Sequence, residues 1–413
     1  MTLDAATFLL TELGLSSMDW EDCFPKPRLP PWDDPHKVTR YSDSTLQPLR
    51  QRGDPATDPL ISKIAGVGPK GRQTKAVHDF FHHLISKDYF VATRFKSTLS
   101  PAVYNELLAW TSGTVIVPAD LDRQRIQRAA QFFKDHFFAI GVVLSTSSLL
   151  EGYACRRGVQ VLHRAGRLSH FTNRRLAETL RFVLYVCAPE GFTKRGHALE
   201  AIQKIRLMHS AIRWLTKSHN WDQNEYGEPI NREDLLGVLM CFSTLIFRDL
   251  PKLLIPVSYD EADDYRYLWN VVGGMLGNEV SLLPNSVGES LALTMAIERR
   301  QQEGSPEGVD MAAALVAYHR HFLKEWVDSV GVLVMRWLAG DAVCDMVGIA
   351  PFAFGAGIDS FEVLGTVRDW GVEIWGHGDE TIGGVRVKPY PIPPSLRGLW
   401  GHLDDMAVGW YGS

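Results

Sequence analysis

The residues with the clearest chemical potential in this sequence are one histidine and two arginines. Arg206, His209 and Arg213 lie in the run Arg206-Leu-Met-His209-Ser-Ala-Ile-Arg213. At 3.6 residues per helical turn, the histidine shares an apolar stripe with Ile202, Ile205 and Ile212. The arginines lie three positions before and four positions after the imidazole, so both flank it. A neutral imidazole is a common metal ligand, and a buried guanidinium requires an anionic partner.

An iron porphyrin would meet both requirements, because its iron takes a neutral imidazole and its propionates are anions. A lone histidine on an apolar face is more often a hydrogen-bonded core residue than a ligand, so the two arginines carry this hypothesis. The structural alternative is that Arg206 and Arg213 form buried ion pairs, for instance with Glu178 or Glu200.

A second polar group precedes this run, at Arg175-Leu-Ala-Glu178-Thr179. Arg175 and Thr179 are four residues apart, which places a guanidinium and a hydroxyl on one helix face beside Glu178. If this helix faced His209 across a ligand plane, the group could orient dioxygen or peroxide. The alternative is an ordinary surface pair between Arg175 and Glu178, worth roughly a few tenths of a kcal/mol.

Taken in order, these two runs and Asn231-Arg-Glu-Asp-Leu-Leu-Gly237 resemble the rubber oxygenase (latex-clearing protein) family. The wider group includes fungal MpaB-type membrane oxygenases. The RxxxT element alone is weakly specific and RxxHxxxR is moderately specific, whereas their order and spacing together are more specific. The resemblance extends over residues 75 to 290.

The resemblance implies an α-helical, globin-related fold with haem b, in which His209 is the proximal ligand and Arg206 and Arg213 line the pocket. It implies that dioxygen binds opposite His209, on the side of Arg175 and Thr179. The implied activity is that of a haem-dependent oxygenase acting on an apolar, unsaturated, isoprenoid-like substrate. A haem-binding or haem-free helical scaffold of the same fold, without catalysis, is the alternative.

The sequence departs from the family pattern at Glu178. Some family members have a lysine immediately before the threonine, and this lysine can ligate iron in a closed state. A carboxylate is a weaker ligand, but it can donate or accept a proton if burial raises its pKa. The family's separate distal glutamate has no clear counterpart, because Glu151 lies too far upstream of Arg175.

Composition and charge exclude several classes of protein. The 43 Lys and Arg residues against 48 Asp and Glu give a net charge of −5, which provides no bulk attraction to nucleic acid or anionic lipid. The start of the chain lacks the basic region of a secretory signal, so we expect a cytoplasmic protein. The apolar stretch Phe137 to Leu150 is too short to span a bilayer and predicts a buried core helix without a transmembrane segment. Five widely separated cysteines without a CxxC pair argue against disulfides, a zinc cluster and covalent haem.

Helical periodicity dominates the middle of the chain and predicts an all-α fold. We expect an N-terminal arm over 1–72, a helical catalytic domain over 73–350 and an irregular C-terminal wrapping segment over 351–413. The arm is Pro-rich before residue 33 and is predicted to be extended, as a surface strap or a docking segment for a partner such as a second subunit in a homodimer. The expected helices are 74–96, 101–112, 122–141, 170–187, 195–217, 231–249, 261–276, 287–303, 307–325 and 326–347.

Smaller signals complete the sequence prediction. Thr172, Asn231, Ser258 and Ser286 are the expected helix caps. The best strand candidates are Thr114–Val117 and Gly384–Lys388, so any sheet is marginal. His78 and His82 have the spacing of a helical metal site but lack an HExxH glutamate, and a half-exposed aromatic helix is favoured there.

Overall fold

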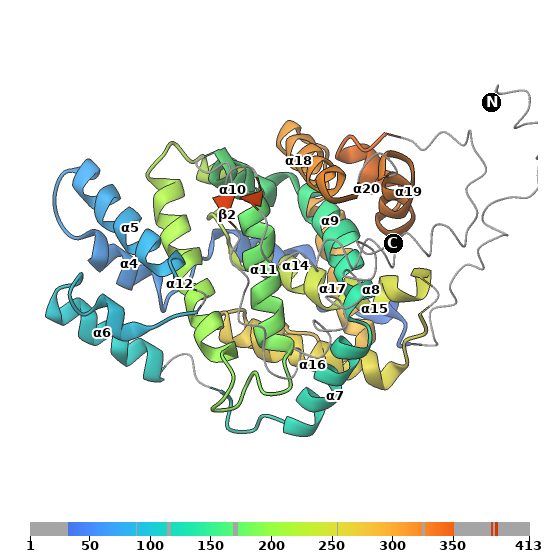
Figure 1. The fold of residues 1–413 in the computed structure, drawn as a ribbon, viewed down its shortest axis with the longest axis horizontal. Helices are drawn as coiled ribbons and strands as arrows, with labels where there is room; N and C mark the ends of the chain where they lie inside the picture. The colour runs from blue at the N-terminus through green and yellow to red at the C-terminus, as the bar shows by residue number, and fades with distance from the viewer. Residues whose placement is uncertain are drawn as a thin grey trace, which may run out of the picture.

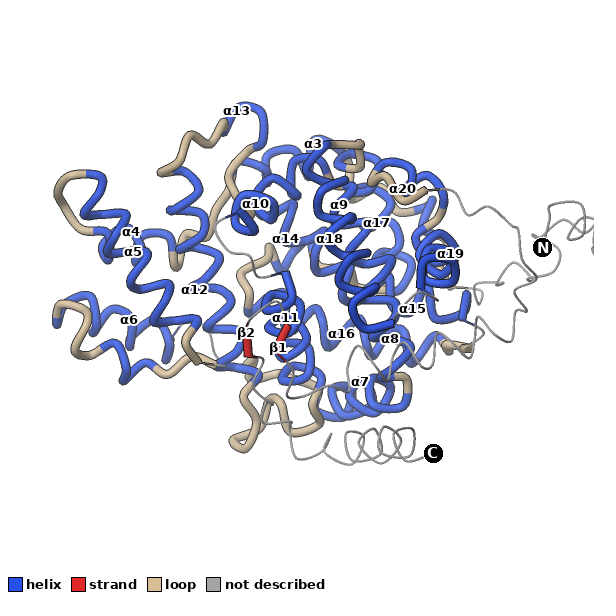
Figure 2. The backbone as a smooth tube through the Cα atoms, turned by 45° about the horizontal axis from the view of Figure 1, so that its top comes forward, coloured by secondary structure: helices blue, strands red, loops and turns tan. Residues whose placement is uncertain are grey.

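The computed structural model describes residues 32–87, 89–113, 117–167, 172–253, 255–323 and 327–350, together with two short strands, Thr381–Ile382 and Val385–Arg386. Apart from these strands, the described chain consists of helices joined by loops and turns (Figure 2), which confirms the all-α prediction. The α-helices before residue 190 are α3 Asp43–Leu46, α4 Asp58–Ala65, α5 Lys70–Ile85, α6 Pro101–Gly113, α7 Arg123–Asp135, α8 Phe137–Val143, α9 Leu149–Ala154, α10 Arg156–Arg167 and α11 Thr172–Cys187. Those after residue 190 are α12 Ala198–Lys217, α13 Gln223–Tyr226, α14 Arg232–Phe242, α15 Thr244–Asp249, α16 Tyr259–Met275, α17 Val287–Gln301, α18 Pro306–Leu323, α19 Val327–Ala339 and α20 Asp341–Met346.

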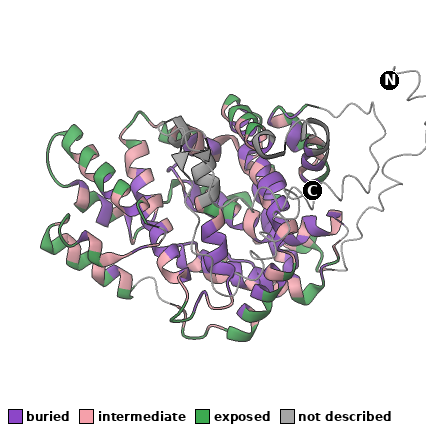
Figure 3. Cartoon of the chain, in the orientation of Figure 1, coloured by how far each residue is buried: buried purple, intermediate pink, exposed green. Residues whose placement is uncertain are grey.

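Helix α12, which carries His209, lies between two groups of helices (Figure 1). On one side it packs against α4 and α5, and on the other it packs against α11. Buried residues gather in the centre of the molecule, whereas the outer faces of α5 and α6 are exposed (Figure 3). Helix α12 is therefore held on several sides, and its orientation depends on the segments that contact it.

Local sequence signals set several helix boundaries as expected. Asn231 caps α14 by accepting a hydrogen bond from the Asp234 N–H, and Ser286 caps α17 in the same way through Glu289. Ser258 forms a capping box with Glu261 at the start of α16. The Thr172 prediction is displaced, because this threonine is the first residue of α11.

The longest apolar segment forms one continuous helical stretch, Phe137–Ala154, in which α8 and α9 are joined by a π-helical turn at Leu144–Ser148. With 18 residues it is long and apolar enough to cross a membrane, so the prediction that it is too short was wrong. The prediction of a buried core helix is confirmed, since 78% of the stretch is buried inside the protein.

The N-terminal arm differs from its prediction. Residues 32–65 contain α3, α4 and the 3₁₀ helices Pro35–Lys37 and Gln47–Gln51, so this part is not extended. Arg50, Asp54 and Thr57 are buried within the chain. These residues therefore belong to the core of the helical domain. The Pro-rich run before Trp32 lies outside the described residues.

The C-terminal prediction is tested only at one point. Thr381–Ile382 and Val385–Arg386 pair as antiparallel strands, which confirms part of the Gly384–Lys388 candidate. The rest of the proposed wrapping segment, and most of the Thr114–Val117 candidate, lie outside the described residues.

Candidate functional site

His209 lies on a half-buried face of α12 with Ile205, Met208 and Ile212. Its Nδ1 atom is enclosed and has no hydrogen-bond partner among the described residues. Burial, together with the charge of Arg213 and against the opposing charge of Asp54, lowers the pKa of His209 to about 3. The imidazole is therefore neutral at pH 7, which is the form that binds a metal.

Arg206 does not share the half-buried face of His209. Its Nε and Nη2 atoms donate to the two carboxylate oxygens of Asp54, at 2.5 and 3.0 Å, and Nη1 donates to the Met275 carbonyl at 3.0 Å. Burial alone would raise the pKa of Asp54, but the hydrogen bonds and the charge of Arg206 hold it below its usual value. This is a bidentate, charge-assisted pair inside the protein.

Arg213 has a similar environment two helical turns further along α12. Its Nε atom donates to Asp58 Oδ1 and Oδ2, at 2.9 and 3.1 Å, and Nη1 donates to the Ile230 carbonyl at 2.8 Å. The third nitrogen, Nη2, donates to the Ser210 hydroxyl at 2.8 Å. Only 1% of the Arg213 surface is exposed, and its charge is compensated by Asp58, whose side chain is 29% exposed.

The interpretation of the two arginines must therefore be corrected. Their charges are neutralised by Asp54 and Asp58, so they have no need of porphyrin propionates as anionic partners. The alternative of buried ion pairs is the one observed, but its partners come from the N-terminal segment and not from Glu178 or Glu200. Arg206 and Arg213 fix the helix that carries the histidine.

Sequence reasoning missed Asp54 and Asp58, which are separated from their arginines by 152 and 155 positions. One signal was available. Two buried arginines on one helix require two carboxylates close to them. The short segment Gly53-Asp54-Pro-Ala-Thr-Asp58 supplies two acids four residues apart.

The second predicted group lies on α11, which packs against α12. Glu178 is half-buried and Thr179 is exposed, while the side chain of Arg175 lies outside the described residues. Neighbouring helices thus carry His209 and the Arg175–Thr179 group. That His209 and the Arg175–Thr179 group lie on opposite sides of one bound haem stays a prediction.

The residues around His209 fit a haem. A neutral imidazole with an unpartnered, enclosed nitrogen is the donor that a haem iron requires, and the flanking Ile205, Met208 and Ile212 offer an apolar surface to a porphyrin ring. Among the described residues, no group of three or more His, Cys, Asp or Glu side chains could hold a metal ion. Within these residues His209 is therefore suited to a cofactor that brings its own remaining ligands, as a porphyrin does.

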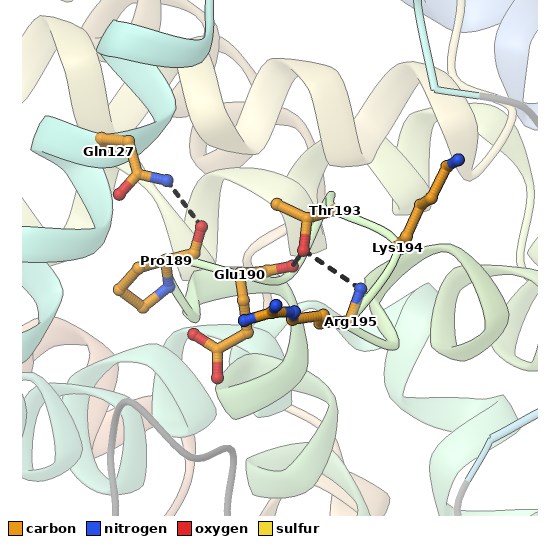
Figure 4. Close-up of a pocket in the computed structure, with 6 residues that line it drawn as sticks. All are labelled: Gln127, Pro189, Glu190, Thr193, Lys194 and Arg195. Carbon is orange, nitrogen blue, oxygen red and sulfur yellow. Dashed lines mark hydrogen bonds between the residues drawn. The ribbon is translucent and has the colours of Figure 1, made fainter.

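A hollow of about 500 Å³ lies elsewhere, on the loop between α11 and α12 (Figure 4). There the Gln127 amide donates to the Pro189 carbonyl, and charged side chains of Glu190, Lys194 and Arg195 contribute to the lining. Neither His209 nor Glu178 lines it. This hollow lies on a surface loop, and not among the aromatic and aliphatic helix faces that the sequence predicts for a substrate channel.

Two other histidines form a close pair on α5. His78 and His82 are exposed, and their Nε2 atoms are 3.2 Å apart, as expected for residues one helical turn apart. His83, next in sequence, instead contacts the Arg94 carbonyl through Nε2 at 3.1 Å. The pair belongs to an exposed helix face, as the sequence predicts.

Comparison with known proteins is consistent with this geometry. A family model described as "ER-bound oxygenase mpaB/B'/Rubber oxygenase, catalytic domain" matches residues 138–367, which include all three motifs but begin and end later than the predicted range of 75–290. The rubber oxygenase of Streptomyces sp. (strain K30) is 22% identical over 237 residues, which are 57% of this chain and 58% of that protein. The chain thus matches less than two thirds of the length of that relative.

A solved structure has the same fold. The latex clearing protein LCP in the closed state superposes with a TM-score of 0.61, over 87% of this chain and 91% of that one, at 17% sequence identity. At this identity the likeness concerns the fold alone. It accounts for the helical architecture, whereas the site must be argued from the residues present here.

Proposed function

Since this chain belongs to the family of ER-bound MpaB-type oxygenase and rubber oxygenase catalytic domains, we propose that it is a haem b-dependent oxygenase. The proposed substrate is apolar, unsaturated and isoprenoid-like. The observation that carries the proposal is His209, whose neutral imidazole has an enclosed Nδ1 atom without a partner among the described residues. Haem, when bound, supplies the iron that makes dioxygen reactive.

The residues of the chain have separate roles in this proposal. His209 would hold the iron of the haem, and Ile205, Met208 and Ile212 beside it would exclude water from the bound cofactor. Glu178 and Thr179 on α11 are the groups we propose to orient dioxygen and move a proton, together with Arg175. An apolar surround suits an isoprenoid, because it favours burial of hydrocarbon without unpaired polar groups.

The cofactor proposal is tested by the absorption spectrum of protein expressed with a haem precursor. We expect a Soret band in the wild type and its loss or displacement in His209→Ala. His197→Ala is the matched control, because His197 is also half-buried and its Nδ1 atom also lacks a partner among the described residues, but its ring stacks on Tyr89 at 4.0 Å. An unchanged spectrum in His209→Ala would refute the ligand assignment.

The alternative of a scaffold without catalysis is favoured by one observation. Glu178 occupies the position where some family members have an iron-binding lysine, so a change of role at this position is consistent with loss of activity. A test must therefore measure turnover as well as cofactor binding.

Turnover is tested with squalene, an isoprenoid with six double bonds, and with squalane, its saturated counterpart, as the control. Cleavage of one C=C bond by one dioxygen molecule gives two carbonyl groups and needs no reductant, whereas hydroxylation needs two electrons from a donor. We expect dioxygen uptake and carbonyl products with squalene alone. If the haem-loaded protein takes up no dioxygen with either hydrocarbon, with or without a reductant, the result would support the scaffold without catalysis.

A further inference from the structure

We propose that residues 50–58 are a positioning element of the haem site, acting on the ligand helix through the buried face that adjoins the half-buried face of His209. Asp54, Thr57 and Asp58 fix the rotation of α12, so that His209 points to one place, and they neutralise the two arginine charges beside it. This inference rests on the proposed function, because it assigns a role in holding the iron ligand.

The contacts form three rungs between the segment and α12. Arg206 pairs with Asp54, Ser210 Oγ lies 2.6 Å from Thr57 Oγ1, and Arg213 pairs with Asp58. Positions 206, 210 and 213 are separated by four and three residues, so they lie on a single face of the helix. A rotation or a shift of α12 would break all three rungs together.

The N-terminal side of the rungs is itself fixed. The Asp54 N–H donates to Asp58 Oδ2 at 2.8 Å, and the Arg232 Nε atom of α14 donates to the Gly53 carbonyl at 3.1 Å. Arg50 continues the anchorage through Asp234 and Gln301, at 3.0 and 2.9 Å. The segment is thus attached to α14 and α17 and can act as a fixed support.

Charge gives the element a second effect on the iron ligand. Asp54 is 4% exposed and its partner Arg206 is 6% exposed, so loss of the carboxylate would leave a buried cation three residues from His209. An uncompensated positive charge near a haem favours the ferrous over the ferric state. Removal of Asp54 should therefore change the reduction potential as well as the strength of haem binding.

The test uses the haem-loaded full chain and compares Asp54→Asn and Asp58→Asn with Asp43→Asn. Asp43 is the control for loss of an ion pair by a nearby N-terminal acid: it pairs with Arg300 of α17 at 2.6 Å, and 75% of its side chain is exposed. The readouts are the rate of haem transfer to apomyoglobin, the ferric/ferrous midpoint potential and the helical circular dichroism.

We expect haem loss at least tenfold faster in Asp54→Asn, with a shift to a more positive potential and unchanged helix content. Asp43→Asn should stay within twofold of the wild type. Thr57→Val, which removes one neutral rung while keeping the side-chain volume, serves if Asp54→Asn does not fold, and we expect a smaller increase in the rate of haem loss.

This inference alone would be overturned if the folded Asp54→Asn protein had the wild-type rate of haem loss and the wild-type potential. If Asp54→Asn does not fold, the same result in Thr57→Val and Asp58→Asn would overturn it. A wild type without haem, or a Soret band retained in His209→Ala, would instead overturn the proposed function and this inference with it. The two failures are therefore distinguishable.

Discussion

Glu151 lies in a buried charge cluster that balances only if one carboxyl keeps its proton. Arg248 contacts Glu151, Asp249 and Glu298, and Lys252 contacts Asp249 at 2.9 Å. Two cations thus face three carboxyl groups. Burial raises the pKa of Glu151 to about 8, opposed by Arg248 and reinforced by Glu298 and Asp249. A protonated Glu151 leaves two positive and two negative charges.

This proton makes the stability of the protein depend on pH. The unfolded chain releases it above the ordinary pKa of 4.5, while the folded protein keeps it until about pH 8. The folded state therefore binds more protons between these values, and the free energy of unfolding falls as pH rises, by up to about 1.4 kcal/mol per pH unit. The stabilising contribution of the protonated carboxyl is largest at the acidic end of this range.

Glu151→Gln should flatten the dependence, because the amide cannot lose a proton. Denaturant unfolding at several pH values between about 5 and 8 measures the slope. Glu303→Gln is the control, since Glu303 is 68% exposed and lies 3.8 Å from Arg156 at the surface. Equal slopes in the wild type and Glu151→Gln would contradict the assignment of the proton.

Single residues were predictable where their role is local. Asn231, Ser258 and Ser286 cap helices because a side chain reaches a backbone N–H two or three residues away, which the sequence displays directly. Asp54 and Asp58 were not predictable in this way. Their partners lie far along the chain, and Glu178 and Glu200 satisfy the same chemical requirement at closer range.

At the scale of elements, the end of α16 is shaped around Arg206. Gly277 follows this helix with φ of +95°, a left-handed conformation that favours glycine, and its carbonyl accepts a hydrogen bond from Arg232. A Cβ atom at this position would lie 2.9 Å from the Arg206 Nη2 atom. The turn is thus incompatible with a larger residue unless the arginine moves.

We therefore expect Gly277→Ala to lower the free energy of unfolding by about 1–3 kcal/mol. Gly152→Ala is the comparison, because Gly152 lies within α9 and a Cβ there meets nothing within 4 Å. That substitution should raise stability by about 0.5–1 kcal/mol. Denaturant unfolding measures both, and a neutral effect of Gly277→Ala would mean that Arg206 yields easily.

Most helices were predictable from apolar periodicity, but their interruptions were not. The expected helix 122–141 breaks at His136, and 231–249 breaks at Ser243, where the backbone φ and ψ are −110° and −72°. Helix α10 was missed because Gly158 and Gly166 lower its local propensity. It is stabilised by packing against α9 and α18, which a local pattern does not show.

At the scale of the whole molecule, the Phe137–Ala154 stretch meets the length requirement for a membrane span but is largely enclosed by other helices. A segment that already buries its apolar surface in protein has little to gain from a bilayer. We expect alkaline carbonate to release the expressed protein from membranes. Retention in the pellet until detergent is added would show that this stretch, or a segment outside the described residues, enters the bilayer.

The part of the chain that holds α12 in place extends beyond the region that matches the family model. That region begins at residue 138, whereas the counter-ions of Arg206 and Arg213 lie at Asp54 and Asp58. A chimaera that received residues 138–367 alone would acquire two buried cations without their anions. Recombination between relatives would thus preserve the two ion pairs of α12 only when the upstream segment is transferred together with this helix, or when the recipient already carries two suitably placed acids.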